Sequence, residues 1–268
     1  MLGAVIGDIC GSPYEFIEYD VPYNFPLLVR GCTFTDDTVL TMAVADSLLE
    51  CYDSDNETMF KKVLVDNLKQ YGRAFHNAGY GGRFIEWIWD TESKPYNSFG
   101  NGSAMRVSPV GWVFDDLETT RKFARWSAEV THNHPEGVKA AECTASVIFL
   151  ARTGHDLNYI EQWVKTNFNY NIYDIPQSYY VSCQTTMPIC LKALYDSRDF
   201  ESALRNAISY GHDTDTYGAI TGSMAEALYG LDKKIVVDAI DILPDVLVDV
   251  LIDFLEIRRK RSDGLRDM

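Results

Sequence analysis

Two short acidic segments of the sequence carry the residue types that bind divalent cations. The first reads Thr-Asp-Asp-Thr at 35–38, and the second reads Asp-Thr-Asp-Thr at 213–216. Carboxylate and hydroxyl oxygens are hard ligands that prefer Mg²⁺, Ca²⁺ or Mn²⁺. Four carboxylates gathered without a cation would repel one another, and some would have to be protonated; a bound ion removes that conflict. The pair of segments predicts a site for one or two divalent cations if the fold brings them together.

Both acidic segments lie where a helix is expected to begin. At such an entry the backbone is freer than inside a helix, so Asp36 and Asp37 can face one point. Asp213 and Asp215 fall on one side of an extended or turn segment, because side chains there alternate with period two. The alternative for each segment is simple N-capping, since Asp and Thr are preferred at helix starts and acids complement the helix dipole. Capping does not explain why a doubled Asp flanked by Thr recurs.

A glycine-rich loop lies between the two acidic segments in the sequence. Residues 100–106 read Gly-Asn-Gly-Ser-Ala-Met-Arg. Backbone N–H groups of such a loop, leading towards a helix start, suit a diphosphate. The alternative is a plain Asn-Gly turn.

Two histidines and a few aromatic residues are further candidates for ligand contact. His132 and His134 have H-x-H spacing, but no thiol or third histidine lies near in sequence, which disfavours zinc. His132 either contacts a substrate or serves the core or a helix cap. Tyr80, Arg83 and Tyr96 suit either the aromatic wall of a nucleoside site or ordinary core packing.

Helical periodicity dominates the rest of the chain, so the sequence predicts one all-α domain over residues 1–268. The acidic segments then open two of these helices, and a helical bundle must bring them together. Short apolar runs at 27–29 and 179–181 are the only strand signals, and no repeat or linker divides the chain. Helices are predicted over 37–51, 57–74, 80–89, 117–130, 135–153, 156–167, 183–196, 199–209, 214–229 and 245–260.

Composition narrows the classes of function. The 39 acidic residues against 24 basic ones give a net charge of -15, which repels a nucleic acid backbone. No apolar stretch is long enough to span a membrane, and the first residues lack the pattern of a signal peptide. The six cysteines have no C-x-x-C spacing and are expected to be free thiols in a reducing compartment. We expect a cytoplasmic protein, and a monomer as the simplest state.

Five segments in this order resemble the motifs of the ADP-ribosylglycohydrolase family. The pattern is most similar to that of bacterial members such as the dinitrogenase reductase-activating glycohydrolases. Together the motifs extend from residue 3 to about residue 230, and their combination is specific, whereas one alone would be weak. They are Gly3–Glu15, Thr35–Thr38, Gly100–Arg106, Thr131–Gly137 and Gly211–Thr216.

This resemblance implies an all-α bundle with two metal ions, usually Mg²⁺ and sometimes Mn²⁺, at the base of a cleft. Glu15 matches an acidic residue near the reacting water and the metal. His132 matches a substrate-binding histidine, and Asn101, Gly102 and Ser103 match a loop that holds the diphosphate. The residues that match metal ligands are Thr35, Asp36, Asp37, Asp213, Asp215 and Thr216.

One departure from the family pattern concerns substrate preference. The last motif usually begins Gly-Gly-Asp, and here His212 replaces the second glycine. If that position needs a positive φ, histidine carries strain there. Its side chain would narrow the cleft or contact the substrate.

The activity implied by the resemblance is hydrolysis of the bond between ADP-ribose and an acceptor, with arginine on a protein as the leading acceptor. Cleavage at C1 of a ribose passes through an oxocarbenium-like state, and two metals can bind vicinal hydroxyls and position a water. Glu15 is the leading base, with Asp36 and Asp213 as alternatives. Other linkages (O-linked serine, a nucleobase adduct or a free small-molecule metabolite) and a non-catalytic binding module remain competing interpretations.

Overall fold

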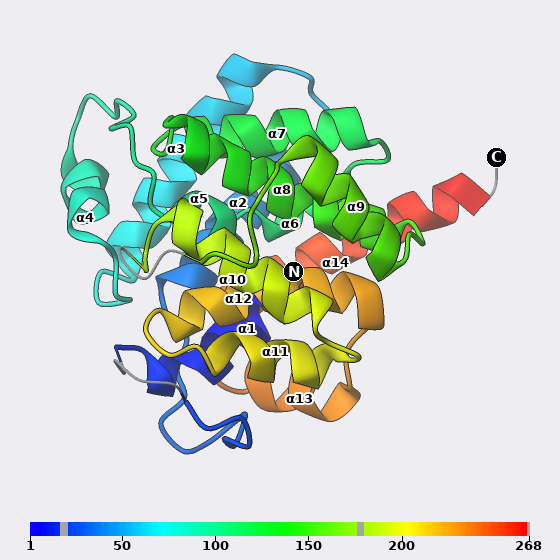
Figure 1. Ribbon diagram of the computed structural model, residues 1–268. Helices are drawn as coiled ribbons and strands as arrows, with labels where there is room; N and C mark the ends of the chain where they lie inside the picture. Colours follow the sequence, from blue (N-terminus) through cyan, green and yellow to red (C-terminus); the bar gives the residue numbers. More distant parts are fainter. Residues whose placement is uncertain (17–20, 176–179, 267–268) are drawn as a thin grey trace.

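The computed structural model describes residues 1–16, 21–175 and 180–266, with side chains up to residue 257. The predicted all-α fold is confirmed: the described residues form helices joined by loops and turns, and their β pairing is limited to one bridge between Gly100 and Ser182. Figure 1 shows these helices packed around one another, and a single hydrophobic core draws residues from α1 through α14. Each helix in the described residues is too short or too polar to cross a bilayer.

The helices predicted from periodicity are all present, and their ends lie within two residues of the prediction except at the C-terminus, where α14 runs six residues further. The agreement reflects capping residues and an apolar face repeating at helical spacing. Their bounds are α2 Asp36–Cys51, α3 Glu57–Ala74, α4 Gly82–Trp89, α7 Leu117–Glu129, α8 Pro135–Arg152, α9 Leu157–Asn167, α10 Cys183–Tyr195, α11 Phe200–Ile208, α12 Thr214–Tyr229 and α14 Asp245–Arg266.

Several helices were not predicted. The first helix is buried along nearly its whole length, so it lacks the polar face that reveals a surface helix. Two others are only one or two turns long, and another carries β-branched residues that favour strands. These elements are α1 Leu2–Gly11, the 3₁₀ turn η1 Ser12–Tyr14, α5 Gly102–Met105, α6 Ser108–Val113 and α13 Lys233–Ile240.

The two predicted strands are wrong. Residues 27–28 form a bend, residue 29 has no regular structure, residues 180–181 form a turn, and residue 179 lies outside the described residues. A strand needs a neighbour along its length for its backbone hydrogen bonds. Within the described part of the chain, this pairing at the second run is limited to the Gly100–Ser182 bridge and a hydrogen bond of 2.9 Å from the Asn101 N–H to the Val181 carbonyl. Leu27 and Leu28 instead pack against the helical core as partly buried side chains.

The most extensive helix pair is α1 with α12, and glycines make it possible. A Cβ atom built on Gly7 would lie 1.9 Å from the carbonyl oxygen of Gly218, and one on Gly222 would lie 2.2 Å from that of Gly3. The two backbones therefore touch, which only residues without a side chain permit. This contact sets the end of α1 beside the start of α12, where the second acidic segment lies.

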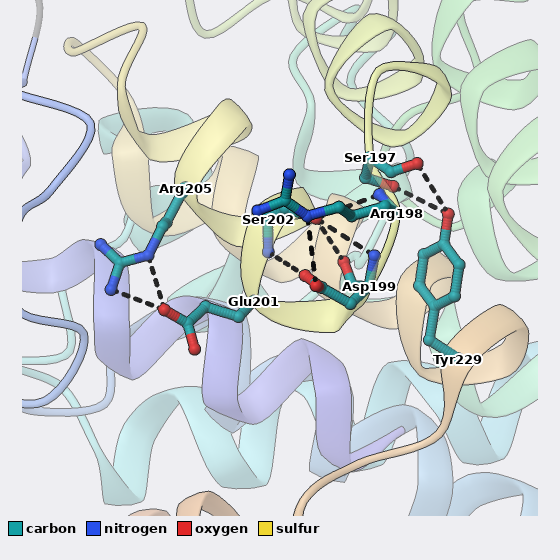
Figure 2. Close-up of polar contacts among 7 residues, drawn as sticks. All are labelled: Ser197, Arg198, Asp199, Glu201, Ser202, Arg205 and Tyr229. Atoms are coloured by element: carbon teal, nitrogen blue, oxygen red, sulfur yellow. Dashed lines mark hydrogen bonds and ion pairs between the residues drawn. The ribbon is translucent and has the colours of Figure 1, made fainter.

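The far end of α12 is anchored by the cap of α11 (Figure 2). Asp199 Oδ1 accepts a hydrogen bond of 2.7 Å from the Ser202 N–H, and Ser202 Oγ accepts one of 3.1 Å from the Asp199 N–H. This reciprocal arrangement satisfies two N–H groups at a helix start. Beside it, the hydroxyls of Ser197 and Tyr229 lie 3.0 Å apart, which ties the start of α11 to the end of α12.

Candidate metal and substrate site

A cavity of about 530 Å³ opens where the starts of α2 and α12 meet the loop before α5. The fold brings most of the predicted site residues to this one place, although they come from segments up to about 200 residues apart. Three predicted residues, Thr35, Asp37 and Ser103, do not line it. Those that line it are Glu15, Asp36, Asn101, Gly102, His132, Asp213, Asp215 and Thr216.

The first acidic segment is both a helix cap and part of the cavity. The Thr35 hydroxyl accepts a hydrogen bond of 3.3 Å from the Asp37 N–H, as the capping interpretation requires. Asp36 lines the cavity, whereas Asp37 is buried beneath it. One Asp37 carboxylate oxygen accepts a hydrogen bond of 3.0 Å from the Thr216 hydroxyl, so the two acidic segments are in direct contact.

The second acidic segment joins Glu15 and the glycine-rich loop. One carboxylate oxygen each of Glu15, Asp213 and Asp215 lies within 4.8 Å of the others, a separation that suits a shared cation. The Asn101 amide donates a hydrogen bond of 2.5 Å to Asp213, which holds that carboxylate at the N-terminal end of α12. The His212 carbonyl accepts a hydrogen bond of 2.9 Å from the Phe16 N–H and thereby fixes the segment that carries Glu15.

Asp8 is a central acidic residue that sequence reasoning did not select. It is fully buried, and it accepts hydrogen bonds from the backbone N–H and the hydroxyl of both Thr35 and Thr38. Burial and the nearby Asp215 raise its pKa to about 7. The sequence signal that could have identified it is a lone aspartate within the apolar segment 1–9. Burying a carboxylate is costly unless hydrogen bonds or a cation compensate its charge.

The carboxyl groups around the cavity have raised pKa values. Burial, followed by the charge of Asp215, raises the pKa of Glu15 to about 8 and holds the pKa values of Asp36 and Asp37 well above their usual range. In the described part of the chain, no lysine or arginine forms an ion pair with these acids. The cluster is therefore a concentrated set of acids without a protein cation to balance it.

The donor set fits a hard divalent cation. Every candidate ligand is an oxygen atom, and one oxygen of the buried Asp37 carboxylate has no hydrogen-bond partner. A buried unpaired carboxylate oxygen is costly, and a cation is the partner that would satisfy it. By contrast, His132 and His134 do not form a zinc pair: His132 lines the cavity, while His134 caps α8 by accepting from the Glu136 N–H.

The glycine-rich loop presents backbone rather than side chains to the cavity. A Cβ atom built on Gly102 would lie 3.0 Å from Nε2 of His132, so the missing side chain leaves that nitrogen accessible. The Ser103 side chain is fully buried, and its hydroxyl donates a hydrogen bond of 2.8 Å to the Gly137 carbonyl. Any contact between Ser103 and a substrate would therefore be made by its backbone.

The cavity is also lined by three residues for which the sequence allowed either core packing or contact with a ligand. Tyr80, Arg83 and Tyr96 all line it. The Arg83 guanidinium lies over the Tyr96 ring, 4.9 Å from its centroid, and also donates to the Tyr96 carbonyl. These residues give an otherwise acidic cavity a basic and aromatic side, which suits a nucleotide.

His212 adopts the left-handed backbone conformation that its replacement of glycine predicted. Its φ is 62°, and its ring stacks on Tyr180 with centroids 3.6 Å apart and planes at 8°. Non-glycine residues are uncommon in this region of φ, so the stacked ring offsets a strained backbone. The side chain lies beside the second acidic segment but is not among the residues that line the cavity, so the expected narrowing of the cleft by His212 is not seen.

With this site on an all-helical scaffold, the chain belongs to the ADP-ribosylglycohydrolase family, whose model matches residues 1–262. A solved structure described as an ADP-ribosylglycohydrolase-related protein complex has the same fold, with a TM-score of 0.75 at 23% identity. The alignment covers 96% of this chain and 95% of that one.

Particular relatives span different activities and lengths. The chain is 29% identical to ADP-ribosylhydrolase ARH3 of Gallus gallus over 58% of this chain and 49% of that one, and thus spans about half the length of that relative. It is 26% identical to ADP-ribosylarginine hydrolase Tri1 of Pseudomonas putida over 86% of this chain and 70% of that one.

Proposed function

We propose that this protein hydrolyses the glycosidic bond between ADP-ribose and an acceptor, with ADP-ribosylated arginine on a protein as the preferred substrate. The observation that carries the proposal is the convergence of Glu15, Asp213 and Asp215 on one point at the base of the cavity. Arg83 and Tyr96, which also line the cavity, provide groups that suit a nucleotide. The name of the Pseudomonas putida relative supports arginine as the acceptor.

Mg²⁺ is the cofactor that we propose, with Mn²⁺ as a substitute, because every candidate ligand atom is an oxygen. Two ions fit the number of carboxylates. When bound, they supply Lewis-acid chemistry and lower the pKa of a water molecule. The residues that would hold them are Thr35, Asp36, Asp37, Asp213, Asp215 and Thr216.

The protein's own groups position the sugar and move the proton. Glu15 lies half-buried at the cavity, and as the leading base it would take the proton from the attacking water. Asn101 fixes Asp213, and Gly102, which has no side chain to cover Nε2 of His132, lines the cavity where the diphosphate would bind. Positive charge that develops on the ribose at the transition state is stabilised by the surrounding carboxylates.

A panel of linkages tests the proposed function. The protein is incubated, with Mg²⁺ and with chelator, with ADP-ribosylated arginine, serine-linked ADP-ribose, a nucleobase adduct and a free metabolite, and released ADP-ribose is measured. We expect release from the arginine substrate that depends on Mg²⁺. Faster release of ADP-ribose from another linkage would show that arginine is not the preferred acceptor. No release from any linkage would favour a binding module of the same fold.

The metal-free protein is expected to lose stability as the pH rises, and Mg²⁺ to restore it. The folded pKa values of Asp8 and Glu15 are raised to about 7 and about 8, so the folded state binds more protons than the unfolded state above about pH 4. Stability then falls between about pH 4 and pH 8. Mg²⁺ at about 100 times its Kd adds about 2.7 kcal/mol, or about 5 °C or more in melting temperature.

Thermal unfolding at about pH 5 and pH 8, with chelator and with Mg²⁺, measures both effects. The larger Mg²⁺ shift should occur at the higher pH, because the carboxylates are then deprotonated. A chelated protein that becomes more stable from pH 5 to pH 8 would contradict the proposed acidic site.

A further inference from the structure

His132 lies in a chain of hydrogen bonds that begins at Arg106. Arg106 is fully buried, and its Nη2 donates hydrogen bonds of 2.9 Å to the Ser127 carbonyl and 2.8 Å to the Thr131 hydroxyl. The Thr131 hydroxyl lies 2.7 Å from Nδ1 of His132. The other ring nitrogen, Nε2, faces the glycine-rich loop at the cavity.

The direction of each hydrogen bond in this chain follows from the donors available. A guanidinium only donates, so Thr131 Oγ1 is an acceptor towards Arg106. Thr131 is fully buried, and its single hydroxyl proton has no other acceptor among the described residues than Nδ1 of His132. If Nδ1 carried the proton instead, the Thr131 hydroxyl would face two donors and its own proton would be unpaired, at a cost of about 1–3 kcal/mol.

A neutral ring is required for this arrangement, and the surroundings provide one. Burial, together with the positive charges of Arg106 and Arg83, holds the pKa of His132 well below its usual range. With Nδ1 acting as an acceptor, the one proton of the neutral imidazole must be on Nε2.

We propose that Arg106 and Thr131 are positioning residues that lock His132 in the Nε2–H tautomer, so that the cavity receives one fixed neutral donor for a substrate oxygen. The Nε2–H group lies beside Gly102, where a Cβ atom would approach it to 3.0 Å. A neutral donor suits a site that must hold an anionic diphosphate close to a metal cluster, because it adds no cation that would compete for the carboxylates. The identity of the ligand rests on the proposed function, whereas the tautomer does not.

The tautomer is measured directly by two-bond ¹H–¹⁵N correlation spectra of the full chain labelled with ¹⁵N-histidine. His132→Gln identifies the signal of His132 by its loss. Near neutral pH we expect the pattern of a neutral ring protonated at Nε2. A ring protonated at Nδ1, or a charged ring, would overturn the proposal.

Two substitutions of Thr131 separate positioning from packing. Thr131→Val keeps the shape and removes the hydroxyl, so the ring should lose its single tautomer; Thr131→Ser keeps the hydroxyl and should retain it. Calorimetry with ADP-ribose should show about tenfold weaker binding for the valine variant and less than about threefold for the serine variant. An unchanged tautomer in Thr131→Val, or equal losses in both variants, would contradict the proposal.

The two proposals can fail separately. If wild-type protein shows the Nε2–H tautomer but neither binds ADP-ribose nor hydrolyses any linkage, the proposed function is wrong and the tautomer assignment stands. If the enzyme hydrolyses ADP-ribosylated arginine but His132 is protonated at Nδ1, the proposed function stands and the role of Thr131 is wrong.

Discussion

An Asp215→Asn variant is expected to hydrolyse ADP-ribosylated arginine about 10³-fold more slowly than wild type while unfolding at a higher temperature without metal. The loss corresponds to several kcal/mol of transition-state stabilisation, as expected when a metal ligand is removed. The gain in stability follows because the charge of Asp215 raises the pKa values of Asp8, Glu15, Asp36, Asp37 and Asp213. Steady-state kinetics and chelated thermal unfolding measure the two effects.

Asp196→Asn is the matched control for this variant. Asp196 is exposed, lies outside the cavity and pairs with Lys192 on the surface, so its loss should change neither activity nor the response to Mg²⁺. The Asp215→Asn variant should also show a smaller Mg²⁺ shift than wild type. Full activity in Asp215→Asn, or a Mg²⁺ shift equal to that of wild type, would remove Asp215 from the metal site.

Gly7→Ala is expected to destabilise the protein by about 3 kcal/mol or more, because the added methyl group overpacks a helix contact. Its Cβ atom would lie 1.9 Å from the Gly218 carbonyl oxygen, so α1 and α12 must move apart. For a chain of this size, such a loss lowers the melting temperature by roughly 6–12 °C. Thermal and urea unfolding measure it.

Gly82→Ala provides the control, because a Cβ atom there would meet no heavy atom within 4 Å. At that helix start the substitution should be neutral or slightly stabilising, since alanine reduces the freedom of the unfolded chain. If Gly7→Ala were as stable as Gly82→Ala, the close contact between α1 and α12 would be wrong.

Most helices of this fold could be predicted from the sequence, including the largely buried α8 and α12, whereas α1 could not. Helix α3 has an apolar face and a capping Asn56, so its bounds followed from the pattern. Helix α1 is buried nearly all round and has glycine at every fourth position, features that a periodicity search does not associate with a helix. Its identity as a helix depends on α12, which lies about 200 residues away.

The candidate site was predictable to the level of residue type. The doubled aspartates with threonines, together with the order of the motifs, indicated Asp36, Asp37, Asp213 and Asp215. The fold brings these four residues together in one acidic cluster. Asp8 was missed because its role arises from hydrogen bonds to the first segment, which no local pattern reveals. The path from Arg106 to His132 likewise depends on tertiary contacts.

The contact of α1 with α12 also has a consequence for the order of folding. Asp8 and Glu15 precede Asp213 and Asp215 by about 200 residues, so these acids complete their surroundings only when α12 has been made and docks on α1. Contacts between such distant parts of a chain form late and slowly, because a long loop must close before they are stabilised. During synthesis on the ribosome, the acidic base of the cavity is therefore expected to assemble after most of the other helices, so a partly made chain has no competent site.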